Sequence, residues 1–257
     1  GIAEADMVAT AAGIATTGKI PFASTFAHFA AGRAFDQIRN SVAYPHLNVK
    51  ICPTHAGVSL GEDGGSHQSV EDVALMRAIP GMVVLSPADA VETEKMIFAA
   101  AEYEGPVYVR LGRLNIPVLF DEDYTFEIGK AVTLTQGDDV AILATGLMVS
   151  EALKAEKLLK EKGIKARVIN VSTIKPLDTE TVLKAAKECK FIVTSEEHSV
   201  IGGLGSAVSE YLSEVHPTKV IKHGIQDIFG QSADGETMLT NYGLRAENIV
   251  ELVLKNM

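Results

Sequence analysis

A glycine-rich loop that contains two histidines and an acidic pair is the segment of this sequence best suited to chemistry. His55 and His67 bracket the loop, and Glu62 and Asp63 lie between them together with four glycines. Histidine can hydrogen-bond phosphate or hydroxyl groups and can transfer protons near neutral pH. Glycine permits positive φ and lets the backbone approach a ligand closely. These residue types predict a small-molecule site.

Three other interpretations of this loop stay open. Glu62 and Asp63 could hold a divalent cation, although the loop lacks the alternating oxygen ligands of a dedicated calcium loop. His55 and His67 could bind zinc, but their spacing matches no familiar zinc pattern and no cysteine assists them. The glycines could also form a turn without a function. We predict no metal site in this chain.

Two arginines predict an anion site at the end of another apolar run. Arg110 and Arg113 follow the run 107–109. Arginine is suited to bidentate recognition of phosphate. A single arginine at a strand end would indicate a surface salt bridge, but two arginines at the same sheet edge favour an anion site.

Two aromatic residues and one acid have both a structural and a functional interpretation. Phe26 and Phe29 follow the strand predicted at 21–25 and would share one helical face, either in the core or beside a ligand ring. Glu4 lies in the first turn of the first predicted helix, where the helix dipole favours an acid.

The second half contains a weaker pair of signals. The glycines of Gly202-Gly203-Leu204-Gly205 do not continue into a dinucleotide-binding pattern, so we predict close packing of a strand against a helix. The preceding Glu196-Glu197-His198 is predicted to form an exposed loop or a contact with a neighbouring chain.

Strands and helices alternate on both sides of a linker at 114–130, which predicts an α/β fold. We expect two doubly wound domains with mainly parallel sheets, at residues 1–120 and 121–257. In such folds ligands bind at the carboxyl ends of the strands. The expected strands are 21–25, 48–52, 82–86, 107–111, 139–145, 166–171, 191–195 and 219–222. The expected helices are 3–16, 28–43, 70–78, 90–103, 149–162, 179–187, 204–215 and 246–255.

Composition narrows the class of partners. The chain has 257 residues and a formal net charge of −10, which argues against non-specific binding to nucleic acid or an anionic membrane. No apolar run is long enough to span a bilayer, and no signal peptide is recognised. Cys52 and Cys189 are predicted to be buried and reduced, which is typical of a cytoplasmic protein. Because Gly1 begins inside a motif, we expect the natural chain to extend upstream.

Several motifs occur together in an order that resembles transketolases. The motifs of the first half are Gly1-Ile2-Ala3-Glu4, Ser24-Thr25-Phe26-Ala27-His28-Phe29, Thr54-His55, Gly61-Glu62-Asp63-Gly64-Gly65-Ser66-His67-Gln68, Pro87-Ala88-Asp89 and Arg113. Those of the second half are Ile174-Lys175-Pro176-Leu177-Asp178, Glu196-Glu197-His198 and Gly202-Gly203-Leu204-Gly205-Ser206. The resemblance covers essentially the whole chain.

The resemblance implies a thiamine diphosphate enzyme that transfers a two-carbon ketol unit between sugar phosphates, in the pentose phosphate pathway. The first domain would bind the pyrimidine end of the cofactor, without the family's first strand, and the second would be the transketolase C-terminal domain. The domain that holds the diphosphate and Mg²⁺ (or Ca²⁺) is absent from the sequence. We therefore expect a split transketolase, in which this chain is the C-terminal subunit, needs an N-terminal partner subunit and self-associates as a dimer. A fragment of a single-chain transketolase would have the same sequence features.

Roles carried over from the family fall on residues already singled out. Glu4 matches the glutamate that hydrogen-bonds the cofactor's aminopyrimidine, and Phe26 and Phe29 match its aromatic pocket. Catalytic roles are implied for Glu4, Asp63 and His67. The residues expected at the substrate are His55, Asp63, His67, Arg113 and Arg110, with His55 and Arg113 at the acceptor phosphate.

Two alternative functions remain. Deoxyxylulose-phosphate synthase shares these motifs, and Arg33-Ala34-Phe35-Asp36-Gln37 resembles that enzyme in particular. Its donor would be pyruvate with loss of CO₂, whereas a transketolase uses a ketose phosphate. The other alternative is a non-catalytic partner subunit, against which the joint presence of Glu4, Asp63 and His67 argues.

Overall fold

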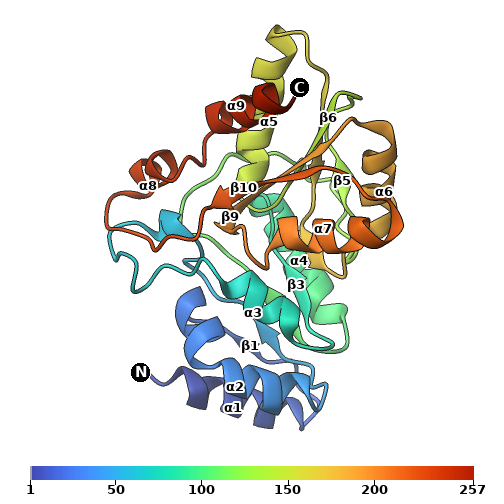
Figure 1. Cartoon of the computed structure of the whole chain (residues 1–257). Helices are drawn as coiled ribbons and strands as arrows, with labels where there is room; N and C mark the ends of the chain where they lie inside the picture. Colours follow the sequence, from blue (N-terminus) through green and yellow to red (C-terminus); the bar gives the residue numbers. More distant parts are fainter. Residues whose placement is uncertain (1) are drawn as a thin grey trace.

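The computed structural model describes residues 2–257, so Gly1 of the first motif lies outside the described residues. The chain forms two α/β halves, each built around a five-stranded sheet. In Figure 1 the first half is drawn in blue to green and the second in yellow to red, with helices against both sheets. The predicted class of two α/β domains with mostly parallel sheets is confirmed.

The first sheet has the strand order β1-β2-β4-β3-β8, and the β1–β2, β2–β4 and β4–β3 pairs are parallel. Its strands are β1 (Phe22–Ala23), β2 (Lys50–Ile51), β3 (Val83–Leu85), β4 (Val107–Val109) and β8 (Thr173–Lys175). Its helices are α1 (Glu4–Ala15), α2 (Phe35–Gln37), α3 (Asp72–Ala78) and α4 (Ala90–Glu102). The predicted helix at 28–43 is instead a short α2 flanked by wider π-helical turns at Phe29–Arg33 and Ile38–Ala43.

The second sheet has the order β10-β9-β6-β7-β5. Its strands are β5 (Val132–Thr133), β6 (Val140–Ala144), β7 (Ala166–Asn170), β9 (Ile192–Ser199) and β10 (Val220–Ile225). Its helices are α5 (Met148–Glu161), α6 (Thr179–Glu188), α7 (Leu204–Val215), α8 (Gly235–Asn241) and α9 (Ala246–Asn256). The central strands are buried along their whole length, as expected for parallel strands covered on both faces. None of the helices described in residues 2–257 is long and apolar enough to cross a membrane.

Strand β8 joins the two halves, and the sequence pattern did not predict it. It follows β7 of the second sheet but pairs antiparallel with β3 of the first. The Lys175 ammonium donates to the carbonyls of Arg77, at 2.8 Å, and Ile79, at 2.6 Å. The second half is therefore attached to the first through a shared sheet as well as through the linker.

The predicted linker is held against the first half by a buried acid. Asp89 caps α4 by accepting from the Glu92 backbone at 2.7 Å, and its other oxygen accepts from the backbone of Leu119 and Phe120 at 2.6 and 2.8 Å. Glu92 in turn accepts from Tyr124 at 2.7 Å and from Asn170 of β7 at 2.9 Å. These bonds fix the linker to both halves.

Candidate functional site

The carboxyl ends of β1 and β2 bring two of the predicted site residues into contact. Phe26 and Thr54 form a parallel bridge beyond the two strands, and the Ala27 backbone donates to the Thr54 carbonyl at 2.8 Å. This places the Phe26 ring on the His55 ring, with centroids 4.0 Å apart and planes 14° apart. The pairing of β1 with β2 thus positions the aromatic residues that lie just past the ends of these strands.

Phe29 and His67 extend this contact into a cluster of four rings. The Phe26 and Phe29 centroids are 6.2 Å apart, and the edge of His67 meets Phe29 at 5.2 Å. His67 also lies 6.4 Å from Phe26. The aromatic pair is therefore grouped with both loop histidines at one edge of the first sheet.

Glu4 reaches the same cluster through a residue that the motif analysis did not assign to the site. The Arg33 guanidinium donates to the Glu4 carboxylate at 2.9 Å and lies over the Phe29 ring, 4.5 Å from its centroid. Glu4 is buried, and a hydrogen bond to its own backbone amide, together with Arg33, lowers its pKa below the ordinary value. The spacing of Arg33, four residues after Phe29, could have indicated a shared helical face.

A surface cavity of about 320 Å³ lies beside Glu4. It is lined by Ala3, Glu4, Asp6, Met7, Ser24 and Thr25. A buried carboxylate on the wall of an open cavity is suited to binding a polar heterocycle.

His55 is held in a strained conformation and in its neutral form. Its φ of +62° lies in the left-handed region, which non-glycine residues rarely adopt. Its Nδ1 lies 2.7 Å from the Thr54 hydroxyl, which leaves Nε2 for a ligand. Burial and the nearby charge of Arg113 lower the pKa of His55, so the ring is uncharged at neutral pH.

Arg113 and Asp63 lie together at the open side of the site. The Arg113 guanidinium donates to the Leu60 carbonyl at 2.7 Å and lies 3.5 Å from the Asp63 carboxylate. Both side chains are more than two-fifths exposed. No hydrogen bond joins Asp63 to His67 among residues 2–257. The structure thus brings Asp63 to the arginine rather than to the histidine.

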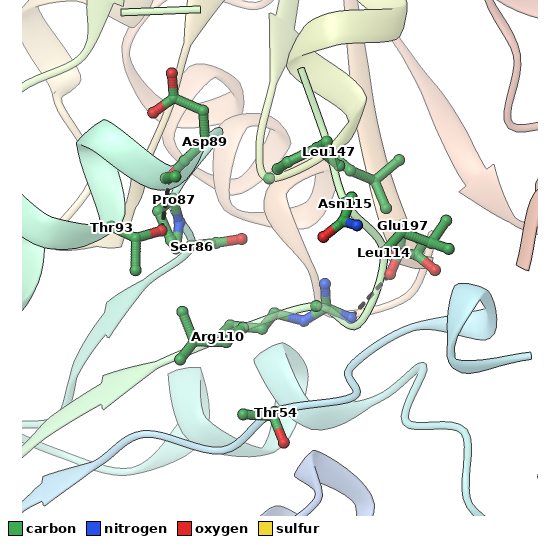
Figure 2. Close-up of a pocket in the computed structure, with 15 residues that line it drawn as sticks. Thr54, Ser86, Pro87, Asp89, Thr93, Arg110, Leu114, Asn115, Leu147 and Glu197 are labelled. Carbon is green, nitrogen blue, oxygen red and sulfur yellow. Dashed lines mark hydrogen bonds between the residues drawn. The ribbon is translucent and has the colours of Figure 1, made fainter. Parts of the chain in front are cut away.

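Arg110 does not join this group. It is buried, with its Nε 2.9 Å from Asp72 and one terminal nitrogen 2.9 Å from the Glu197 carbonyl. Figure 2 shows its side chain running along the wall of a second cavity toward Glu197. This cavity measures about 600 Å³ and lies between the two halves. Nε and one terminal nitrogen of the guanidinium are thus bound by protein groups, and a phosphate contact by Arg110 stays a prediction.

Glu196, Glu197 and His198 are buried, so the prediction of an exposed loop or a contact with another chain is wrong. All three lie in β9, which continues past the predicted end at residue 195. Glu196 accepts from the backbone of Leu204 and Gly205 at 2.7 and 2.8 Å and so caps α7. From sequence alone, acidic residues at the end of a strand are expected to be exposed to solvent. Their burial here is explained by the packing of α7 against β9.

The glycine cluster packs as predicted. A Cβ at Gly205 would come within 2.6 Å of the Thr194 hydroxyl and 2.8 Å of the Lys222 side chain, so α7 lies directly on the strands. In the part of the chain that the structure describes, no three His, Cys, Asp or Glu side chains are grouped to hold a metal ion.

Family models match both halves of the chain. The model described as "Transketolase, pyrimidine binding domain" matches residues 1–118, and "Transketolase, C-terminal domain" matches residues 129–249. Together these matches cover most of the sequence, and the gap between them, residues 119–128, lies within the predicted linker.

Individual relatives point the same way. A putative transketolase C-terminal section of Methanocaldococcus jannaschii is 51% identical over the whole chain and 81% of that protein. A 6-deoxy-6-sulfo-D-fructose transketolase subunit of a Clostridium species is 45% identical over 97% of the chain and 78% of that protein. A 1-deoxy-D-xylulose-5-phosphate synthase of Trichormus variabilis is 38% identical over 99% of the chain but only 41% of that protein.

A solved structure has nearly the same fold. It is described as a split gene transketolase, inactive beta4 tetramer, and it is 51% identical to this chain with a TM-score of 0.92. The match covers 98% of this chain and 80% of that one.

Proposed function

The chain belongs to the transketolase family, and from this premise we propose that it is one subunit of a split, thiamine-diphosphate-dependent transketolase. It would contribute the pyrimidine side of the active site and transfer a two-carbon ketol unit between sugar phosphates in the pentose phosphate pathway. The observation that carries the proposal is the convergence of Glu4, the Phe26–Phe29 pair and the two loop histidines on one sheet edge.

The residues around Glu4 fit the pyrimidine end of thiamine diphosphate. Glu4 would hydrogen-bond the ring, while Phe26 and Phe29 would form an apolar wall beside it. The cofactor supplies the carbanion chemistry, and the protein supplies orientation and charge. The pKa of Glu4 is low in this chain, and exclusion of water by a bound partner would raise it toward the range useful for proton sharing.

The remaining residues fit a sugar phosphate that enters from the open side. Arg113 and the neutral His55 would bind the phosphate, since an exposed guanidinium and a free imidazole nitrogen both suit its oxygens. Asp63 and His67 would contact the hydroxyl groups nearer the reacting carbon. Phosphate and reacting carbon would thus be held at opposite ends of the proposed substrate site.

Catalysis would require a second polypeptide. We assign the diphosphate and its Mg²⁺ (or Ca²⁺) to an N-terminal partner subunit, because the related proteins are described as a split gene transketolase and as a transketolase C-terminal section. We also propose that two copies of this chain occur in the active particle, with each site shared between subunits. The name of the related structure, an inactive tetramer of beta subunits, is consistent with self-association without activity.

Two further assignments accompany this proposal. We place the boundary between the domains near residue 120, where the linker backbone is bound to Asp89. We also propose a cytoplasmic location, because Cys52 and Cys189 are buried and unpaired.

Reconstitution tests the proposal. The purified chain with thiamine diphosphate and Mg²⁺ should show no ketol transfer from xylulose 5-phosphate to ribose 5-phosphate. Addition of the complementary subunit should produce the activity. Turnover by this chain alone, or none in the mixture with any ketose phosphate donor, would contradict it.

A deoxyxylulose-phosphate synthase activity is the second candidate, favoured by the relative from Trichormus variabilis. The donor distinguishes the two. With pyruvate and glyceraldehyde 3-phosphate the reconstituted enzyme would release CO₂ if this candidate holds, whereas a transketolase would need a ketose phosphate. A non-catalytic subunit would leave both assays independent of Glu4.

A further inference from the structure

The substrate loop, residues 55–68, is held in place by the second half of the chain. Ser59 lies in the single turn of 3-10 helix at Val58–Leu60, and its backbone amide donates to the Glu197 carboxylate at 2.6 Å. Both residues are almost completely buried. A carboxylate from β9 therefore holds the backbone of a loop that belongs to the other domain.

Gly57 indicates how closely this carboxylate approaches. Its φ is +85°, and a Cβ at this position would overlap the Glu197 carboxylate. The Glu197 side chain also lines the cavity between the halves, where Figure 2 shows it opposite Arg110. Any side chain at position 57 would displace it.

A second contact fixes the other end of the loop. The buried Gln68 amide donates to the carbonyls of Val58, Gly61 and Gln231 at 3.0, 3.3 and 2.9 Å. Gln231 belongs to the segment before α8, which runs beside the loop in Figure 1. Glycines in both segments allow this approach, because a Cβ at Gly65 would meet the Gly230 carbonyl at 2.6 Å.

The turn at Gly57–Gly61, which Glu197 and Gln68 hold, contacts residues that are proposed to bind substrate. Arg113 donates to the carbonyl of Leu60, the residue after Ser59, and lies next to Asp63. At the other end, His55 keeps its left-handed φ two residues before Gly57. A shift of the turn would therefore move Arg113, Asp63 and His55 together.

We infer that Glu197 is a positioning residue, whose carboxylate holds the Gly57–Gly61 turn so that His55 and Arg113 keep the geometry needed to bind a substrate phosphate. This inference rests on the proposed function. The second domain would thus contribute to substrate binding through a residue that acts on the turn.

The chemistry of Glu197 supports this role. Burial raises its pKa to about 6, against the opposing effect of Arg110, so it is still mainly ionised at neutral pH. A buried charge is costly compared with an apolar residue of the same size, so stability alone would not favour it. A charge-assisted hydrogen bond to one backbone amide provides directional control that an apolar contact cannot.

Glu196 provides a matched control. It is the neighbouring residue on the same strand and is equally buried, but its carboxylate caps α7 and does not contact the loop. Alanine and glutamine variants at both positions should be compared in the enzyme reconstituted with its partner subunit. Glutamine keeps an oxygen that can accept from the Ser59 amide.

Glu197→Ala should raise KM for a phosphorylated acceptor about tenfold or more, with a smaller change in kcat, since one hydrogen bond to a charged group is lost. KM for glycolaldehyde, which has no phosphate, should change little. Glu197→Gln should recover part of the loss, and Glu196→Ala should lower the melting temperature without changing KM. Equal effects on both acceptors, or equal effects of the two alanine variants, would overturn the inference.

Amide hydrogen exchange provides a readout that does not depend on activity. In the isolated chain, Glu197→Ala should speed exchange in the peptide 57–61, whereas Glu196→Ala should speed it at the start of α7. Unchanged exchange at 57–61 would refute the inference that Glu197 holds this turn, even if the enzyme is active. If the wild-type mixture has no activity, the proposed function fails, while a faster exchange would still establish the contact. If an alanine variant does not fold, Glu197→Gln and Glu196→Gln are compared in the same exchange measurement.

Discussion

The two sheets present very different residues at their carboxyl ends. At the first sheet, His55 has a strained backbone, and Asp63 and Arg113 are more than two-fifths exposed. At the second sheet, Glu196 and His223 are buried and bonded; His223 lies 2.9 Å from Ser195 and 2.7 Å from the Gly243 carbonyl. Similar topologies thus serve two purposes, because one edge leaves polar groups open to a ligand and the other uses them to hold its own helices and loops.

The largest effect expected at the first edge is that of Glu4→Gln. The variant should lower the rate of ketol transfer by about two to four orders of magnitude, because an amide cannot share a proton with the cofactor's pyrimidine ring as a carboxyl group can. Its melting temperature should change little, because the Arg33 partner is half exposed. Asp36→Asn, an exposed acid on α2, is the control and should keep full activity. A Glu4→Gln enzyme with normal rates would remove Glu4 from the mechanism.

Arg113→Ala and His55→Ala should weaken substrate binding rather than chemistry. Each should raise KM for phosphorylated sugars about tenfold or more while kcat changes less, because a contact present in both ground state and transition state is lost. Steady-state kinetics with ribose 5-phosphate and with glycolaldehyde would measure this. Equal losses with both acceptors would mean that these residues do not recognise phosphate.

Gly57→Ala tests the close contact between Glu197 of the second half and the turn at Gly57 of the first half. The variant should lower the free energy of unfolding by about 1–3 kcal/mol, because alanine is strained at a φ of +85° and its Cβ would overlap Glu197. Gly13→Ala is the control; it lies within α1 with no atom near its Cβ and should raise stability by about 0.5–1 kcal/mol. Urea denaturation measures both. Similar effects at the two glycines would contradict the close approach.

The smallest predicted effect is a pH dependence that belongs to Glu197. Its pKa is about 6 in the folded chain, against an ordinary value of 4.5, so the folded state binds more protons between these values. The free energy of unfolding of the wild type relative to Glu197→Gln should therefore fall by about 1.3 kcal/mol as pH rises from about 4.5 to about 6. Urea denaturation at both pH values measures the difference, and a constant difference would contradict the buried, titrating carboxyl.

Local patterns predicted most of the elements correctly. Alternating apolar runs and helical periodicity located the central strands of both sheets and the helix Leu204–Val215 with its bounds. Asp178 caps α6 by accepting from the Thr181 backbone amide at 3.0 Å, an interaction that involves only the next three residues and so can be recognised from sequence. Strand β8 was missed because its partner β3 lies far away in the chain, and no local period records such a pairing.

The sequence by itself determined the family, the two-domain α/β fold and the residues gathered at the first sheet edge, since these depend on motifs and short-range periodicity. Only the tertiary structure distinguished Arg113 from Arg110, which differ in what packs around them: Asp72 and the Glu197 carbonyl bind Arg110, while Arg113 stays open. The tertiary structure also showed that Glu197 is buried against Ser59. Burial and long-range partners depend on how separate segments pack, and residue type and spacing alone do not contain that information.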